Sequence, residues 1–508
     1  MNDTQNSYLS NIVIVGGGSA GWMAAAALSS LLDPGSVKVT LIESEEIGIV
    51  GVGEASIPDI INFNRMLGIS EADFLRETAG TFKLGIEFID WGRLGDNYFH
   101  PFGSHGVDMN GIDFHQYWLH SQRAGNDARL QDYSLCAVAA NENKFMSPST
   151  DPRSVLSHLR YAYHFDASRY AAYLRKYAEK RGVHRLEGKI EQVKTNSENG
   201  DIHQLVMHNG DVVEGDFFLD CSGFRSLLLG QELGVEYQDW RHWLPCDRAQ
   251  AVACEQAGPL LPYTRATARS AGWQWRIPVQ HRTGNGHIYS SDFLSDDEAA
   301  NTLLENLDGA VIGSPRTIRF QTGHRDVFWS HNCVALGLSA GFLEPLESTS
   351  LYLIQMGISR FISLFPGSSN YGPVRDEYNR QMQQQFEQVR DFIILHYAAT
   401  ERDDSEFWNY CRTMSLPDSL ERKIDLFKSA GRVFRYEEEL FSKDSWLAVM
   451  FGQNMTPQQL DPFVSSVASE DVMRSMNSMS GAMLKAAAQM PEHASFLKQY
   501  IAPKNTNE

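Results

Sequence analysis

The chain has 508 residues, of which 43% are hydrophobic and 11% aromatic, so it is long and apolar enough to bury a large core. Its 63 acidic side chains outnumber its 44 basic ones and give a formal net charge of -19 at pH 7. Because this charge repels phosphate backbones and anionic lipids, we predict neither nucleic acid nor a membrane as a partner.

An apolar strand at residues 11–15 runs through three glycines into an alanine-rich helix. Gly16, Gly18 and Gly21 have the spacing of a dinucleotide cradle, which needs a sharp turn, close approach of a pyrophosphate and tight helix packing. A second strand at residues 37–42 leads to an acid placed to bind a ribose. A glycine-rich surface turn is the alternative. The cofactor-binding residues predicted here are Gly16, Gly18, Ser19, Ala20, Gly21 and Glu43.

The uncharged stretch at residues 12–32 is long enough to suggest a membrane span, but its glycines interrupt any continuous helix. No basic leader precedes it, which argues against a secretory signal. The six cysteines are scattered without the paired spacing of a metal site. We therefore predict reduced thiols, no metal and a cytoplasmic location.

Periodicity predicts the remaining elements in chain order. These are a glycine-rich loop at 48–58, helices at 59–67 and 70–78, a strand at 81–91, an irregular pocket-lining insertion at 93–150, a helix at 168–181, a hairpin around Ile190 and Leu205, and a strand and turn at 217–226 that lead into a helix. The pattern then predicts an antiparallel layer over residues 235–320 and another buried strand and turn at residues 332–341. It predicts that a helix starts at residue 351 and that residues 375–508 are largely helical.

Four further stretches carry a family resemblance: residues 51–58 (GVGEASIP), Lys83 in its strand, residues 272–278 (GWQWRIP) and residues 342–349 (FLEPLEST). Together with the glycine cradle, and in this order, they resemble the flavin-dependent halogenases of the tryptophan-halogenase family. The similarity extends from residue 11 to about residue 453. Many oxidoreductases share the cradle, whereas the double-tryptophan motif is specific to this family among flavoproteins.

The resemblance implies an α/β fold, with a Rossmann-like FAD module of the flavin monooxygenase type, an added antiparallel sheet layer and a helical C-terminal region. We predict one compact unit over residues 1–508. Its FAD module is discontinuous, at about 8–92, 155–230 and 325–370, and its substrate-side regions cover about 93–154, 235–320 and 375–508. Beyond the cradle, the residues implied to bind FAD are Glu54, Ala55, Ile190, Leu338, Ser348 and Leu351.

The implied chemistry is electrophilic halogenation. Reduced FAD, supplied by a separate flavin reductase, reacts with oxygen and chloride or bromide to give hypohalous acid. Lys83 holds this oxidant or is halogenated by it, and Glu347 stabilises the ring intermediate and takes its proton. A lowered lysine pKa favours the halogenated-amine route. The local pattern alone favours a solvent-exposed Lys83. For Glu347 it leaves open a simple alternative, an acid that stabilises the dipole of the following helix.

Further site residues follow from the same resemblance. The backbone amides of Thr349 and Ser350, at a helix start, form a predicted halide site. Tryptophan halogenases have glycine at the position of Ser350, so the local conformation and halide preference are open. Alternation predicts Trp273 and Trp275 on one face of a strand. The family places these indoles near the flavin, where they shield it from substrate; a core aromatic pair is the alternative.

The substrate is predicted as an indole-type or phenolic ring. His100 and Phe102 resemble the family's substrate-lining His-x-Phe, with a hydrogen-bonded loop histidine as the alternative, and Trp446 is a candidate pocket wall. Residues 441–449 do not reproduce the set that recognises free tryptophan. A single-component FAD-dependent aromatic hydroxylase and a non-catalytic flavin-binding module remain as competing functions, and a homodimer is compatible with the resemblance.

Overall fold

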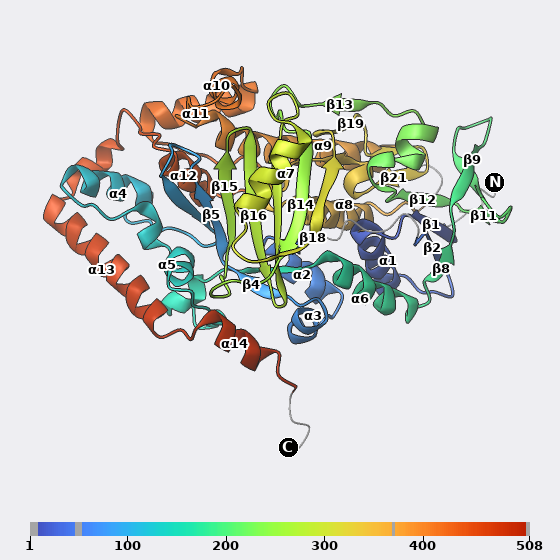
Figure 1. Cartoon of the computed structure of the whole chain (residues 1–508), viewed down its shortest axis with the longest axis horizontal. Helices are drawn as coiled ribbons and strands as arrows, with labels where there is room; N and C mark the ends of the chain where they lie inside the picture. Colours follow the sequence, from blue (N-terminus) through green and yellow to red (C-terminus); the bar gives the residue numbers. More distant parts are fainter. Residues whose placement is uncertain (1–8, 46–52, 368–370, 504–508) are drawn as a thin grey trace, which may run out of the picture.

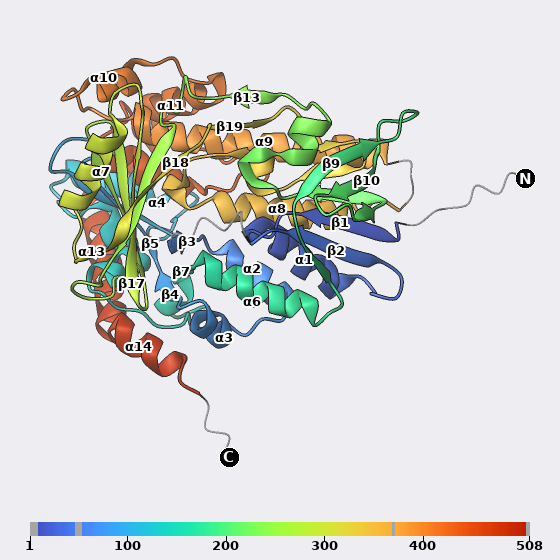
Figure 2. The same cartoon turned by 45° about the vertical axis from the view of Figure 1, so that its right-hand side comes forward.

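The computed structural model describes residues 9–45, 53–367 and 371–503 (Figure 1). Residues 48–52 of the predicted glycine-rich loop lie outside these ranges. In Figure 1 a parallel sheet lies at one end of the molecule and a large antiparallel sheet at its centre, while several C-terminal helices lie at the other end. Figure 2 shows the antiparallel sheet nearly edge-on, with the parallel sheet to one side of it.

The parallel sheet contains the predicted nucleotide-type strands. Its spatial order is β20 (Trp329–Ser330), β21 (Cys333–Ala335), β12 (Phe217–Asp220), β1 (Asn11–Val15), β2 (Lys38–Glu43) and β8 (His184–Glu187). Neighbours run parallel except β20 and β21. Val15 pairs with both Ile42 and Asp220, so three carboxyl ends meet where Gly16 begins the turn. Ligands of open α/β sheets bind at this edge.

Helices α1 (Ser19–Leu31), α6 (Ala167–Glu179) and α8 (Ser350–Ser363) confirm three predicted helices. Helix α1 packs against the other two, and its residues 20–28 are all buried. The helix predicted after β12 is different: a 3-10 turn leads into a π-helical segment, Leu227–Glu232. The Asp220 carboxylate accepts hydrogen bonds from the backbone N–H groups of Leu228 and Leu229 there.

The predicted strand over residues 81–91 is two strands that belong to different sheets. Strand β4 (Thr81–Lys83) joins a small antiparallel sheet with β7 (Ala162–Asp166) and β3 (Gly53–Ala55). Strand β5 (Gly85–Ile89) enters the large sheet. The change of sheet occurs at Gly85, where a Cβ atom would lie 2.4 Å from the carbonyl oxygen of His100. Only glycine permits that approach.

The large sheet confirms the predicted antiparallel layer. Its order is β18 (Val311–Arg319), β14 (Arg248–Cys254), β17 (Arg282–Tyr289), β16 (Gly272–Val279), β15 (Thr264–Arg269), β5 and β6 (Asn97–Pro101). Its last two strands come from the N-terminal part of the chain, and β5 runs parallel to β15. The smaller strands are β9 (Ile190–Thr195), β10 (Ile202–Met207), β11 (Val212–Glu214), β13 (Tyr237–Asp239), β19 (Gly323–Arg325) and β22 (Gly341–Phe342).

The region predicted as irregular, residues 93–150, contains β6 and two α-helices. Helix α4 (Phe114–Arg123) buries Phe114, Tyr117 and Trp118, a helical spacing that the many polar and aromatic residues obscured. The other helices are α2 (Asp59–Met66), α3 (Glu71–Glu77), α5 (Leu135–Asn141), α7 (Asp296–Glu305), α9 (Gly372–Ala398), α10 (Glu406–Thr413), α11 (Asp418–Ala430), α12 (Lys443–Gly452), α13 (Ser469–Ala488) and α14 (His493–Tyr500). None of the described helices has the length and apolarity needed to cross a membrane.

Candidate active site

The glycine cradle has the geometry that a dinucleotide requires. Gly16 adopts a φ of +116°, and a Cβ there would lie 2.1 Å from the Cys221 carbonyl oxygen. A Cβ on Gly21 would lie 1.8 Å from the Gly16 carbonyl oxygen, whereas one on Gly18 would have no protein atom within 4 Å. Helix α1 starts at Ser19 without a side-chain cap or an acid in its first turn. Open space before an uncapped helix start fits a pyrophosphate.

Two glycine variants should separate cofactor binding from folding. Gly18→Ala is expected to weaken FAD binding at least about tenfold, because the methyl group occupies the space open to a pyrophosphate, and to change unfolding free energy by less than about 0.5 kcal/mol. Gly21→Ala should lower unfolding free energy by about 1–3 kcal/mol through its clash with Gly16. Flavin titration and denaturant unfolding test both. FAD binding by Gly18→Ala at wild-type affinity would contradict the assignment.

The predicted ribose acid, Glu43, is partly engaged by the protein itself. Its Oε2 accepts a hydrogen bond from Trp22 Nε1 at 3.1 Å, and its Oε1 accepts one from Arg185 Nε. Gly188 N–H donates to the Glu43 carbonyl at 2.8 Å, which brings the chain leading to Ile190 to the same sheet edge. Glu43 therefore lies in position beside the cradle, with its charge balanced by an arginine.

Three other predicted cofactor residues lie in β3, in the turn after β21 and in α8. Ala55 of β3 pairs with β7 beside Glu54. Leu338 lies in the 3-10 turn that follows β21, and Leu351 lies in the first turn of α8. A cavity of 40 Å³ is lined in part by that turn and by α8. Its lining residues are Ala335, Leu336, Gly337, Leu338, Ala340, Gly341, Phe342, Ser350, Leu353, Ile354, Met382 and Phe386.

Lys83 is fully buried, contrary to what its strand pattern alone favours. Its Nζ donates hydrogen bonds to the Ser56 carbonyl oxygen at 3.0 Å and to Ser348 Oγ at 2.8 Å, and it lies 5.0 Å from the centre of the Phe102 ring. Burial lowers the pKa of Lys83 to about 7, and the Glu347 charge only partly opposes this shift. An amine in this state can donate hydrogen bonds or act as a nucleophile.

Glu347 is 1% exposed and lies between two histidines. His100 Nδ1 lies 3.0 and 2.9 Å from its two carboxylate oxygens, and His396 Nε2 lies 2.8 Å from Oε1. Burial alone would raise the pKa of Glu347, but the contacts of His100 and His396 with its carboxylate outweigh burial and lower it. The carboxylate is therefore ionised at neutral pH and can accept a proton.

His396 is a site residue that sequence reasoning missed. It lies on α9 and is fully buried, and Tyr98 OH lies 2.9 Å from its Nδ1. Gln453 Nε2 donates to Tyr98 OH at 3.3 Å. In the tautomer that suits these contacts, Tyr98 donates to Nδ1 and Nε2–H faces Glu347. The available signal was a lone histidine within the apolar run at residues 392–397.

The predicted halide residues follow Glu347 directly. Ser348 has a left-handed backbone with φ of 60°, Thr349 caps α8, and Ser350 begins that helix. Thr349 is fully buried, and its Oγ1 has no hydrogen-bond partner among the described residues. A buried hydroxyl without a partner, next to a helix start, fits a small anion.

Trp273 and Trp275 lie on one strand, β16, with ring centres 6.1 Å apart. They are 1% and 7% exposed. Trp273 Nε1 donates to Glu344 Oε2 at 2.9 Å, whereas Trp275 Nε1 has no partner in the described part of the chain. The two indoles share a face but differ in hydrogen bonding.

An aromatic cluster surrounds the histidine side of Glu347. The ring centre of His100 lies 5.6 Å from that of Phe392 and 6.3 Å from that of Phe441. Phe392 stacks on Phe441 at 3.7 Å and meets Trp446 edge-on at 4.9 Å. The structure thus brings His100 and Trp446 into one cluster, while Phe102 lies beside Lys83.

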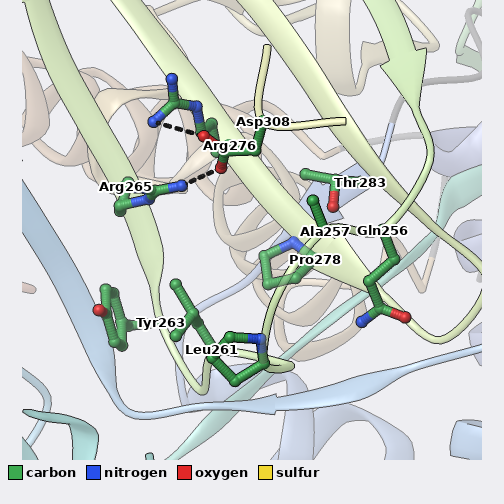
Figure 3. A pocket seen from close by; sticks show the side chains of 10 residues that line it. Gln256, Ala257, Leu261, Tyr263, Arg265, Arg276, Pro278, Thr283 and Asp308 are labelled. Atoms are coloured by element: carbon green, nitrogen blue, oxygen red, sulfur yellow. Dashed lines mark hydrogen bonds and ion pairs between the residues drawn. The ribbon is translucent and has the colours of Figure 1, made fainter. Parts of the chain in front are cut away.

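A larger cavity of 250 Å³ lies away from these residues (Figure 3). It is lined by Gln256, Ala257, Pro259, Leu261, Tyr263, Arg265, Arg276, Pro278, Thr283 and Asp308. Arg276 and Pro278 alternate with the two tryptophans along β16, so this cavity opens on the opposite face of the sheet. Figure 3 shows both arginines turned toward Asp308. The cavity contains neither Lys83 nor Glu347.

The arrangement combines a dinucleotide cradle with a buried amine and a buried carboxylate. Ser348 links the amine to the carboxylate, because it bonds to Lys83 and directly follows Glu347. Among the described residues no cluster of three or more His, Cys, Asp or Glu side chains could hold a metal ion. The buried amine can donate hydrogen bonds or act as a nucleophile, and the buried carboxylate can accept a proton.

Comparisons with known proteins agree with this geometry. The tryptophan halogenase family model matches residues 11–469. The tryptophan 6-halogenase SttH from Streptomyces toxytricini is 35% identical over 468 residues, which cover 87% of this chain and 88% of SttH. Of the three functions that the sequence left open, this match supports halogenation.

Solved structures are similar over almost the whole chain. BrvH, a flavin-dependent halogenase from Brevundimonas sp. BAL3, superposes with a TM-score of 0.94 at 46% identity, covering 97% of this chain and 99% of BrvH. Xcc4156, a flavin-dependent halogenase from Xanthomonas campestris, gives a TM-score of 0.94 at 45% identity and covers 97% of this chain and 98% of its own. The chain therefore belongs to the tryptophan halogenase family and is a flavin-dependent halogenase that uses FAD and a halide.

Proposed function

We propose that the enzyme halogenates an electron-rich, indole-type ring at a site built around Lys83 and Glu347. The burial of this amine and this carboxylate on either side of Ser348 is the observation that supports the proposal most directly. Buried ionisable groups cost folding free energy, so their presence together in a shielded site favours a chemical role.

The cradle residues and Glu43 would hold FAD, together with Glu54, Ala55, Ile190, Leu338, Ser348 and Leu351. When bound in its reduced form with oxygen and halide, FAD supplies hypohalous acid. Thr349 and Ser350 would bind the halide through the start of α8. Trp273 and Trp275 would keep the aromatic substrate away from the cofactor.

Lys83 is proposed to take up the halogen. Because the pKa of its amine is lowered to about 7, about half of the molecules hold a neutral amine near neutral pH. The nitrogen lone pair attacks the halogen of hypohalous acid; a nitrogen–halogen bond forms, the oxygen–halogen bond breaks, and the oxygen leaves as water with a proton from nitrogen. The ring carbon then takes the halogen, and the nitrogen regains a proton.

Glu347 is proposed as the base that completes the substitution. Its ionised carboxylate accepts the proton from the ring carbon that now carries the halogen, and aromaticity is restored. This proton passes on to solvent and balances the one that the Lys83 nitrogen took up. His100 and His396 hold the carboxylate from two sides and keep it charged until that step.

The rate of halogenation should rise with pH up to about 7 and then level off. Burial lowers the pKa of Lys83 from 10.5 to about 7, so below that pH the group is an ammonium ion without a lone pair. Each pH unit below about 7 should reduce the rate about tenfold. Measuring kcat of product formation from about pH 5 to about pH 9, with oxidant production followed in parallel, tests this. A rate that falls as pH rises through about 7 would show that the ammonium form acts instead.

The proposed substrate class rests on the aromatic cluster of His100, Phe392, Phe441 and Trp446. SttH is a tryptophan 6-halogenase, but residues 441–449 here lack the set expected for the amino-acid backbone of free tryptophan. A panel of indoles and phenols, assayed with chloride and bromide and a flavin reductase and analysed by product mass, tests the class. Halogenation of phenols alone would contradict an indole-type substrate.

The remaining parts of the proposal concern partners and organisation. We propose a separate flavin reductase as the source of reduced FAD, a cytoplasmic location and a homodimer. All six cysteines are free and buried, which supports a reducing compartment. We also propose one compact unit in which the FAD segments at about 8–92, 155–230 and 325–370 alternate with the substrate-side segments. Oxidation of NADH or NADPH by the purified enzyme would contradict a separate reductase.

A further inference from the structure

Glu347 belongs to a short segment with a second buried carboxylate, which we name the carboxylate turn (residues 344–349). Glu344 precedes the 3-10 helix Pro345–Glu347 and is fully buried. Its Oε2 accepts two hydrogen bonds, from Trp273 Nε1 at 2.9 Å and from Tyr397 OH at 2.6 Å. Its Oε1 has no partner in the described part of the molecule. None of the proposed chemical steps uses Glu344.

Two consecutive residues of α9 hold the two carboxylates of this turn. His396 lies 2.8 Å from Glu347, and Tyr397 donates to Glu344. Both rings also pack on Trp91, whose ring centre lies 5.9 Å from His396 and 5.4 Å from Tyr397. The same helix end therefore fixes both ends of the 3-10 helix, while Trp273 fixes Glu344 from the large sheet.

The turn needs this support because its backbone is strained. Ser348 is a non-glycine residue with a φ of 60°, a conformation that persists only where surrounding contacts enforce it. Lys83 holds Ser348 through its hydroxyl. The bonds to Glu344 are the contacts that hold the opposite end of the turn.

Resting on the proposed function, we propose that Glu344 is a positioning residue: its hydrogen bonds to Trp273 and Tyr397 hold the carboxylate turn so that Glu347 and Ser348 face the substrate and Lys83. Trp273, the first tryptophan of the W-x-W motif, then helps to position the base through its hydrogen bond to Glu344. Burial raises the pKa of Glu344 to about 7, and the hydrogen bonds from Tyr397 and Trp273 only partly oppose this shift.

The experiment compares halogenated product with total oxidant, the latter measured with an added trap for hypohalous acid. Glu344→Ala should lower product kcat about 100-fold and lower the ratio of product to total oxidant, with KM for the aromatic substrate unchanged, because the base is displaced. Trp273→Phe, which removes one of the two bonds, should lower kcat about tenfold. Glu344→Gln keeps an acceptor oxygen and should restore kcat to within about threefold of wild type.

Trp408→Phe is the matched control for Trp273→Phe. Trp408 is fully buried, packs on Tyr397, and donates its indole N–H to the Arg269 carbonyl at 2.7 Å, away from the turn. It should lower the melting temperature as Trp273→Phe does, yet leave the ratio of product to oxidant unchanged. The double variant Trp273→Phe/Glu344→Ala should be no slower than Glu344→Ala, because Glu344→Ala already removes the bond through which Trp273 acts.

The outcomes separate this inference from the proposed function. If wild-type enzyme makes oxidant but no halogenated aromatic product, the proposed function fails. If wild-type enzyme halogenates and Glu344→Ala or Trp273→Phe keeps the wild-type ratio of product to oxidant, the positioning role is wrong. An equal loss in Trp408→Phe, or no rescue by Glu344→Gln, would also overturn it. Trp273→Phe preserves the test if Glu344→Ala does not fold.

Discussion

Lys83→Met is expected to abolish halogenation while the protein still binds FAD. Methionine fills the same buried volume but cannot carry halogen, and the loss should be roughly 10³-fold or more, as for removal of other nucleophiles and proton-transfer groups. Lys83 Nζ bonds to Ser348, one of the proposed FAD-binding residues, but the glycine cradle and Glu43 lie apart from it at the edge of the parallel sheet. Flavin affinity should therefore change little.

Product formation, flavin affinity and oxidant release must be measured on the same preparation. Lys83→Met should release into solution, where a trap detects it, the oxidant that wild type transfers to the ring. Lys443→Met removes a partly buried lysine that pairs with Asp113, and serves as the control with wild-type activity. Loss of flavin together with activity in Lys83→Met would remove Lys83 from the second site.

Glu347→Gln should reduce kcat by about 10²–10⁴-fold, because the amide occupies the same space but cannot accept the ring proton. FAD and substrate affinity should stay close to wild type. Loss of the charge also leaves His100 and His396 facing a neutral group, which weakens two contacts that orient the side chain.

A deuterated aromatic substrate shows whether the lost step is deprotonation. In Glu347→Gln the removal of the ring proton becomes rate-limiting, so a primary isotope effect on kcat should appear that wild type lacks. Oxidant production should continue at the wild-type rate. An unchanged kcat, or a loss that affects oxidant production equally, would show that Glu347 is not the base.

Much of the fold followed from local patterns. The glycine cradle, the helix at residues 168–181 and the antiparallel layer were predictable because each depends on neighbouring residues with a regular period. The split of residues 81–91 into β4 and β5 was not predictable. Side-chain alternation continues through residue 85, and only the approach of Gly85 to His100 shows that the hydrogen-bonding partners change there.

The site residues also divide into those that the sequence predicts and those that it does not. Lys83 and Glu347 could be predicted because they lie in motifs that resemble a family, whereas His396, Tyr98 and Tyr397 lie in no such motif. The contacts that join the site are also distant in sequence: Lys83 and Ser348 are 265 residues apart, and His100 and Glu347 are 247 apart. No periodic pattern within one stretch of sequence indicates such long-range contacts.

The sequence by itself determined the kinds of chemical group present, their order along the chain and the family to which they belong. Only the tertiary structure decided that Lys83 is buried, that Glu347 lies between two histidines, and that Glu344 is bonded to Trp273. The physical reason is that a pKa and an orientation depend on the dielectric environment and on the partners within a few ångströms. Those partners come from strands and helices far apart in the chain, and folding alone brings them together.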